Sequence, residues 1–324
     1  MAIDRPHWMR PGAAQSRTAA SAVGPEETDA ATGRPAGWHR VPPPLRLFLV
    51  MMGLLAGWYG VLGAALAGID VDLAIRPTAE QLPPGGSVFV GMAARLIEHQ
   101  VIERSFTLND PVFYPTGLAR RTPAFQSGLI LTVADAVAAL DEAGPAPGLS
   151  SAAQSLSVGP HTWWLRAAWP PVGLTAERHY RNAQVALSAH NRAIASAERP
   201  AIASRTLQPG SRAALMALLQ RVEGEAARGN RILRSTEEGS ASVQLSSARG
   251  TAFAAAMLMR GIRDDNAGAI RMSGRAARWG EALDALDAAA AIDPLFVGDD
   301  DLVKSGYSLL LAGNAMRDIL GGQG

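Results

Sequence analysis

Residues Leu47 to Ile69 read LFLVMMGLLAGWYGVLGAALAGI, a run of 23 residues without a charged side chain. A helix rises about 1.5 Å per residue, so this run reaches about 34 Å and is long enough to cross a hydrocarbon core of roughly 30 Å. Later apolar runs are shorter, because Asp135 and Arg260 interrupt them. We therefore predict a single transmembrane helix at residues 47–69.

The sequence on either side of this run differs in composition. Residues 1–46 are rich in Pro, Gly, Ala, Ser and Thr and show almost no aliphatic periodicity. Such a segment buries too little apolar surface to offset the entropy of ordering it, so we predict a disordered tail. Residues 70–85 form a linker that ends in two prolines and two glycines. Residues 86–324 are predicted to form one all-helical domain outside the membrane.

The charges that flank the run predict its orientation. Arg34, Arg40 and Arg46 precede it, whereas Asp70 and Asp72 follow it. Basic residues are retained on the cytoplasmic side of a membrane. The tail is therefore predicted to be cytoplasmic and the helical domain extracytoplasmic, which means periplasmic for a protein of the bacterial inner membrane. The alternative is a cleaved signal peptide, since Ala65-Leu66-Ala67 has small residues at the spacing of a cleavage site.

A stripe of small residues runs along the predicted span. Gly53, Gly57, Gly60 and Ala64 follow one another at helical spacing, and the first two form a GxxxG pair. Small side chains allow two helices to approach closely in lipid. The stripe predicts a homodimer formed through the span, although glycine is also common in membrane helices without such a role.

The remaining sequence predicts an all-α fold, with a multi-helix, bundle-like extramembrane domain. Apolar residues recur at helical spacing, and strand-like alternation is almost absent. Ser87 and Thr175 are placed to cap helices, and Pro209 is placed to open one. The residues from Glu237 to Ser246 are short and polar and predict a loop. The helices are predicted at residues 88–104, 123–142, 176–198, 209–226, 247–263, 267–292 and 301–320.

Composition excludes several classes of protein. The chain has 30 basic and 29 acidic residues, so no net field favours nucleic acid. It has no cysteine, which excludes disulfides, thiolate metal sites and cysteine nucleophiles. The six histidines show neither HxxxH nor HExxH spacing. We predict no cofactor, no metal site and no catalytic residue.

Two loops carry the best candidates for binding. The first contains an acidic-proline turn with two aromatic residues, and the second is rich in tryptophan. Aromatic rings beside an arginine and a histidine can stack on a sugar, hold an acyl chain or rest at a membrane interface. The structural interpretation is that they fill the gap between two helices. The candidate residues are Asn109, Asp110, Phe113, Tyr114, His161, Trp163, Trp164, Arg166 and Trp169.

The order of these motifs resembles a known family. TLNDPVFYPTG at residues 107–117 is followed by a Pro-Ala-Phe-Gln helix start, and GPHTWWLRAAWPP at residues 159–171 by a Tyr-Arg helix. ARGTAFAAAMLMRGI, a helix with Trp279 and a final helix with Gly306-Tyr307 come later. This order resembles DUF2333, a family of membrane-anchored bacterial proteins of unknown function. The resemblance implies an envelope protein without an assigned activity, and it carries over no catalytic residue.

Three functions follow from these observations as expectations. The first is a non-enzymatic, membrane-anchored scaffold or interaction protein with partners in the cell envelope. The second is a periplasmic binding module for lipid, glycan or peptidoglycan, centred on the tryptophan loop. The third and least supported is an envelope hydrolase that uses carboxylates, for example near Asp110.

Overall fold

The computed structural model describes residues 42–66, 69, 71–104, 106–108, 120–162, 173–197, 206–234, 240–294 and 296–321. Within these residues the regular elements are all helices, and none is a strand. The predicted all-α fold class is therefore confirmed.

The first helix, α1, runs from Pro43 to Leu66. It begins four residues before the predicted start, because proline suits the first turn of a helix, where its missing N–H would have no partner. None of its side chains from Pro43 to Val61 is buried. Length and composition make this helix a candidate membrane span.

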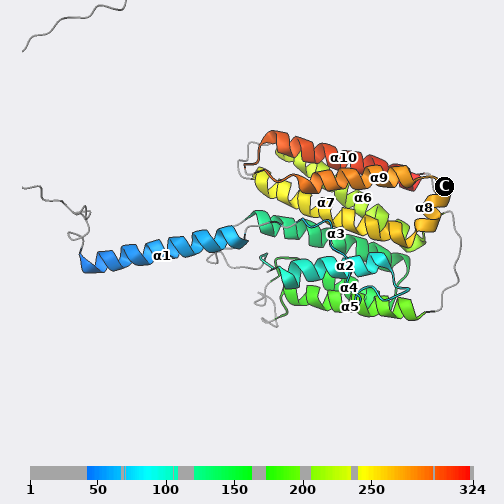
Figure 1. Cartoon of the computed structure of the whole chain (residues 1–324), viewed down its shortest axis with the longest axis horizontal. Helices are drawn as coiled ribbons and strands as arrows, with labels where there is room; N and C mark the ends of the chain where they lie inside the picture. Colours follow the sequence, from blue (N-terminus) through cyan, green and yellow to red (C-terminus); the bar gives the residue numbers. More distant parts are fainter. Residues whose placement is uncertain are drawn as a thin grey trace, which may run out of the picture. The chain divides into compact units, whose positions relative to one another are not determined.

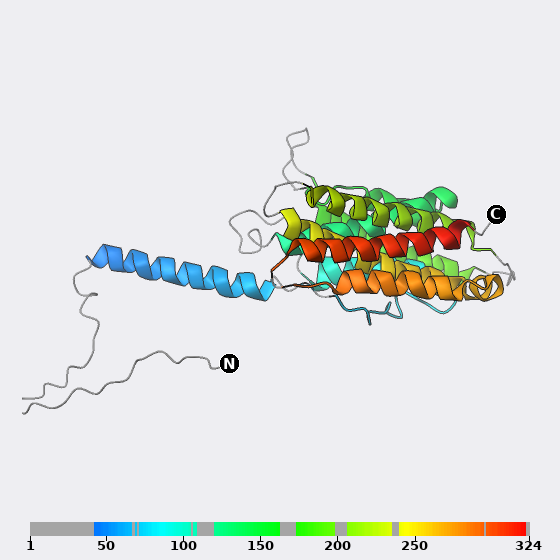
Figure 2. The same cartoon turned by 90° about the horizontal axis from the view of Figure 1, so that it is seen from above.

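The other helices form a bundle in which their long axes run in nearly the same direction, apart from the short α8 (Figures 1 and 2). One π-helical turn, η2, directly continues α2. The elements are α2 (Val88–Glu98), η2 (His99–Glu103), α3 (Arg121–Ala143), α4 (Pro147–Leu156), α5 (Ala176–Ser196), α6 (Pro209–Ile232), α7 (Ser240–Asp265), α8 (Ala267–Ser273), α9 (Ala276–Ala291) and α10 (Asp299–Gly321).

Helix α7 is the centre of the bundle, since it packs against α2, α3, α6 and α9. Its closest approach is to α3, and glycine makes that approach possible. A Cβ atom at Gly250 would collide with the carbonyl oxygen of Phe125, and one at Gly128 would collide with that of Ser247. The backbones of α3 and α7 therefore touch where neither helix carries a side chain.

A continuous apolar core surrounds this contact. Phe125 of α3 and Phe253 of α7 stack with their ring centroids 6.1 Å apart. The apolar residues that recur at helical spacing along α3 lie in this core, since Phe125, Leu129, Val133 and Val137 are all at most 1% exposed. Burial of each such side chain contributes about 1.5–3 kcal/mol of hydrophobic free energy before the entropic cost of folding.

The predicted helix caps are also confirmed. The Ser87 hydroxyl accepts from the Val90 amide at the start of α2. The Thr175 hydroxyl accepts from the Arg178 amide at the start of α5, and Pro209 opens α6. Local hydrogen-bonding chemistry thus determines where these helices begin.

Other predicted boundaries are wrong. The predicted loop at residues 237–246 is helical from Ser240 onward, as the first turns of α7. The predicted helix at residues 267–292 is two helices, because Gly274 adopts a left-handed φ of 69° between α8 and α9. Helix α3 begins at Arg121, two residues before the predicted start at residue 123, and α4 was not predicted. Helix α4 buries Leu149, Ala152 and Leu156 on one face and packs against α3 and α5.

Helix α3 also has the length and composition of a membrane span. Half of its most apolar window is buried, and it packs against α6 and α7. Its Asp135 accepts from the Arg221 guanidinium of α6, with an Nε–Oδ2 distance of 2.7 Å. α3 is therefore a core helix of the bundle.

Candidate functional site

The two predicted binding loops lie largely outside the described residues. This applies to Asn109, Asp110, Phe113, Tyr114, Trp163, Trp164, Arg166 and Trp169. His161 is described, and its side chain is exposed in the turn that follows α4. The binding roles of the other residues remain predictions.

The described residues next to these loops line one pocket, here called the α3–α7 pocket, with a volume of about 530 Å³. It lies where the first turns of α3 and α7 meet the segments that follow η2 and α4. Its lining residues are Thr107, Leu108, Arg120, Pro123, Ala124, Ser127, His161, Arg228, Val243, Gln244 and Ser247.

This pocket brings together the ends of both predicted loops. Thr107 and Leu108 come directly before residues 109–119, and Arg120 comes directly after them. His161 lies two positions before residues 163–172. Two loops that are far apart in sequence therefore begin at the same cavity, a juxtaposition that only the tertiary structure reveals.

A buried carboxylate lies beside the pocket. Glu225 of α6 is 2% exposed, and α7 supplies its hydrogen-bond donors. Gln244 Nε2 donates to Glu225 Oε2 at 2.7 Å, and Ser247 Oγ donates to Glu225 Oε1 at 2.8 Å. Arg228 Nη1 lies 3.5 Å from Oε1. A buried charge must be compensated, and the bonds from Gln244 and Ser247 to this carboxylate join α7 to α6 beside the pocket.

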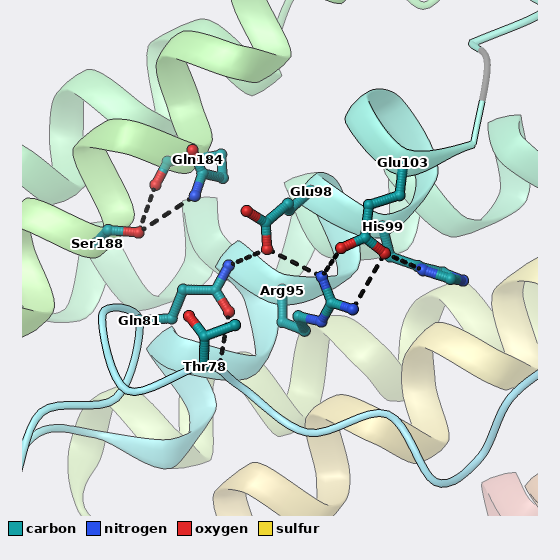
Figure 3. Close-up of polar contacts among 8 residues, drawn as sticks. All are labelled: Thr78, Gln81, Arg95, Glu98, His99, Glu103, Gln184 and Ser188. Atoms are coloured by element: carbon teal, nitrogen blue, oxygen red, sulfur yellow. Dashed lines mark hydrogen bonds and ion pairs between the residues drawn. The ribbon is translucent and has the colours of Figure 1, made fainter.

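A second polar cluster fixes the linker that follows α1 (Figure 3). The Thr78 amide donates to Gln81 Oε1 at 3.0 Å, and Gln81 Nε2 donates to Glu98 Oε2 at 2.8 Å. Arg95 Nη1 lies 2.9 Å from the same Glu98 oxygen, and its Nη2 donates to Glu103 at 3.1 Å. Gln81 thereby bonds the linker to α2, and Arg95 bonds α2 to η2.

Histidine completes this cluster at the π-helical turn. His99 Nδ1 lies 2.8 Å from Glu103 Oε2. Hydrogen bonds from Arg95 and then from His99 lower the pKa of Glu103 to about 2. The neighbouring α5 contributes a separate local pair in the same view, in which Ser188 Oγ donates to the Gln184 carbonyl at 3.0 Å. The hydrogen bonds of the cluster hold the linker, α2 and η2 together.

A second cavity, of about 510 Å³, lies where the N-terminus of α2 meets the C-terminus of α7. Asp265 lines it, and burial raises the pKa of this carboxyl group. Its oxygens accept from Ser87 Oγ at 2.6 Å and from the Val88 and Phe89 amides at 2.6 and 3.0 Å. Asp265 therefore caps α2, and its oxygens are already occupied.

Asn191 holds the linker at the same end of the bundle. It is fully buried, and its amide donates to the carbonyls of Gln81 and Ser87 at 2.6 and 2.9 Å. Its oxygen accepts from the Ser87 amide at 2.7 Å. One side chain of α5 thus satisfies three backbone groups before α2.

Sequence reasoning missed the residues that form the α3–α7 pocket. Arg120, Arg228, Gln244 and Ser247 come from three separate helices or their ends and form no sequence motif. Among the described residues, no group of three His, Asp or Glu side chains is placed to hold a metal ion. Comparison of the chain with family models, with curated protein sequences and with solved structures returned no match.

Proposed function

We propose that this chain is a single-span bacterial inner-membrane protein whose helical bundle is a non-enzymatic scaffold or interaction domain in the periplasm. The observation that carries the proposal is α1, which is apolar, long enough to span, and without a buried side chain from Pro43 to Val61. A soluble environment would leave that apolar surface in water, which is unfavourable. Membership of DUF2333, which rests on the sequence motifs, is part of this proposal.

The polar groups beside the cavities serve to hold helices together, and this supports an interaction role for the bundle. Asp265 caps α2, Glu225 joins α6 to α7, and Asn191 fixes the linker. The hydrogen bonds of these three groups stabilise the fold. The linker cluster of Figure 3 then fastens the bundle to the segment that follows the span.

A topology experiment tests this proposal. A reporter enzyme active only in the periplasm and a fluorescent protein that folds only in the cytoplasm are fused in turn to the C-terminus of the full chain. We expect the periplasmic reporter to be active and to remain with membranes after carbonate extraction. A cytoplasmic signal would overturn the orientation, and a soluble periplasmic signal would indicate cleavage near Ala67.

We also propose that the span forms a homodimer through Gly53, Gly57, Gly60 and Ala64. A Cβ atom added at any of the three glycines would meet no other atom of the chain within 4 Å, so that face is open to a partner helix. Gly57→Leu should abolish disulfide crosslinking between copies that carry a single engineered cysteine in the span. Leu54→Ala, on another face, should leave it unchanged.

The second candidate function is a binding module for lipid, glycan or peptidoglycan. The α3–α7 pocket favours it, because both predicted binding loops begin at this cavity. The full chain and its Trp163→Ala variant would be compared for binding to purified peptidoglycan and to lipid vesicles. Equal binding by the two proteins, or binding by neither, would count against this function.

A further inference from the structure

The α3–α7 pocket has an unbalanced charge. Among the described residues that line it are two arginines and a histidine, Arg120, Arg228 and His161, and none is an aspartate or glutamate. Several other arginines of the bundle pair with carboxylates, as Arg221 does with Asp135. Among the described lining residues positive charge therefore exceeds negative charge, and the nearest described carboxylate is that of Glu225, 3.5 Å from Arg228 beside the pocket.

The contacts of the two arginines leave both of them able to bind an anion. Arg120 is exposed and forms no ion pair with a described carboxylate. Arg228 lies 3.5 Å from Glu225, but that carboxylate also accepts from Gln244 and Ser247. Because neutral donors already share the compensation of Glu225, the guanidinium of Arg228 keeps donors for a second anion.

Neutral donors line the same cavity. The Ser127 hydroxyl makes no hydrogen bond to another described residue, and it lies one turn after Pro123 on α3. The first turn of α3 forms part of the wall, which adds the partial positive charge of a helix N-terminus to that of the arginines. Planar guanidinium groups with hydroxyl donors match the oxygens of a phosphate group better than those of a neutral ligand.

We propose that the α3–α7 pocket binds a phosphate group, which Arg120 and Arg228 hold with His161 and Ser127. The two sources of that group are a soluble phosphate ester and the headgroup of an anionic phospholipid. The phosphate site itself does not depend on whether α1 spans a membrane. Only the lipid source rests on the proposed anchoring.

The short chain between α1 and the bundle favours the headgroup of a membrane lipid as one source of the phosphate. Ser87 lies at the start of α2, whereas Gln81 bonds Glu98 at the end of that helix. The backbone of Gln81 lies beside Ser87, since Asn191 donates to both carbonyls, and its side chain extends to Glu98. Ile69 packs against the core three residues after Leu66, a chain length of at most about 11 Å. On the proposed anchoring, a membrane at the end of α1 would lie within that chain length of Ile69.

Calorimetric titration of the full chain tests the site. The protein is kept in alkyl maltoside micelles, which contain no phosphate, and is titrated with inorganic phosphate and with glycerol 1-phosphate. Arg120→Gln and Arg228→Gln should each weaken binding about tenfold, as expected for loss of a hydrogen bond between charged groups. Arg192→Gln is the matched control, since Arg192 is exposed on α5 and does not line the pocket.

A second arm identifies the source. Phosphatidylglycerol or diacylglycerol, which share their acyl chains, is added to the same micelles, and the unfolding temperature is recorded for each protein. A stabilisation by phosphatidylglycerol alone that Arg120→Gln removes assigns the site to a lipid headgroup, since a ligand of the native state raises its unfolding temperature. Binding of the soluble esters without this stabilisation assigns it to a soluble phosphate.

Two outcomes would overturn the proposal. One is the absence of Arg120-dependent binding in both arms. The other is an equal loss in the Arg192→Gln control, which would show that only the overall charge matters. Arg120→Gln decides the question even where Arg228→Gln is unstable, because Arg228 also pairs with Glu225. Neither outcome bears on the topology test, so failure of the phosphate site and failure of the membrane anchor are distinguishable.

Discussion

Helices α1 and α3 have the same membrane-like composition and very different surroundings. Both are long and apolar enough to cross a bilayer. Half of the most apolar window of α3 is buried in the bundle, whereas no part of that of α1 is buried. Leu129 of α3 is 0% exposed, and Leu55 of α1 is 51% exposed.

The difference lies in what the two helices offer to neighbours. α3 carries Gly128 at a backbone contact with α7 and Asp135 for a bond to α6. These features make it specific for protein neighbours. α1 has no charged side chain between Leu47 and Leu66 with which to form such a bond. Composition indicates that both helices avoid water, and the specific contacts decide which of them enters the core.

The largest expected effect comes from placing an arginine in each helix. Leu129→Arg should lower the free energy of unfolding of the bundle by about 3–5 kcal/mol, because it buries a charge without a partner. Leu55→Arg should leave the bundle intact but reduce its retention in carbonate-washed membranes, since a charge at the centre of a span costs about 2.5–3.5 kcal/mol. Denaturant unfolding and membrane fractionation measure the two effects.

The control for this pair is Met216→Arg, at an exposed position of α6, which should change neither quantity. The comparison fails if Leu55→Arg destabilises the bundle as much as Leu129→Arg does. That result would mean that α1 is part of the core in solution.

The next largest change in stability is expected at the glycine contact between α3 and α7. Gly250→Ala should lower the free energy of unfolding by about 3 kcal/mol, because its methyl group would overlap the Phe125 carbonyl. Gly224→Ala of α6 has open space around it and should instead stabilise by about 0.8–1 kcal/mol through helix propensity. Chemical denaturation of both variants checks the opposite signs. Equal effects would show that the two backbones do not touch.

The linker between α1 and the bundle gives a smaller effect. Asn191→Ala should lower the free energy of unfolding by about 2 kcal/mol, because it leaves buried backbone groups of Gln81 and Ser87 without partners. Hydrogen exchange at the linker amides should increase at the same time. Asn314→Ala, on the exposed face of α10, is the control and should change stability by less than about 0.5 kcal/mol. Unchanged exchange in Asn191→Ala would refute the role of Asn191 in fixing the linker.

The smallest effect is expected from the loss of stability at acid pH, through Glu103 of η2. The pKa of Glu103 is lowered from 4.5 to about 2 in the folded protein, so its contribution is present above pH 4.5 and is lost as the pH falls from about 4.5 to 2. The Glu103 side chain is 44% exposed, and solvent screening keeps this contribution below about 1 kcal/mol. The difference in unfolding free energy between the wild type and Glu103→Gln should shrink over that range. A difference that is constant from pH 7 to pH 2 would contradict the assignment.

Local sequence signals predicted part of this architecture well. Ser87, Thr175 and Pro209 gave correct helix starts, because caps and prolines act on backbone groups a few residues away. The break at Gly274 and the helical start of α7 were missed. The start of α7 is supported by a distant residue, Glu225 of α6, which accepts from Gln244 and Ser247. The break at Gly274 is a local glycine cap, whose amide donates to the Arg271 carbonyl.

The candidate site shows the same division. The sequence indicated two aromatic loops. Of their candidate residues the structure describes His161, which lines the α3–α7 pocket. No sequence signal marked Arg228 or Gln244, because each is one polar residue among many on an amphipathic helix. Only the packing of α6 against α7 places them at one cavity.

The sequence by itself determined that the chain is helical and that residues 47–66 form an uncharged, apolar helix. Helical periodicity, capping and charge distribution are properties of neighbouring residues, so they can be read along the chain. The tertiary structure decided that α3 is a core helix, that α7 lies at the centre, and that Arg120 and Arg228 share a pocket. Those facts depend on backbone approach and on long-range side-chain contacts, which arise only when the helices pack.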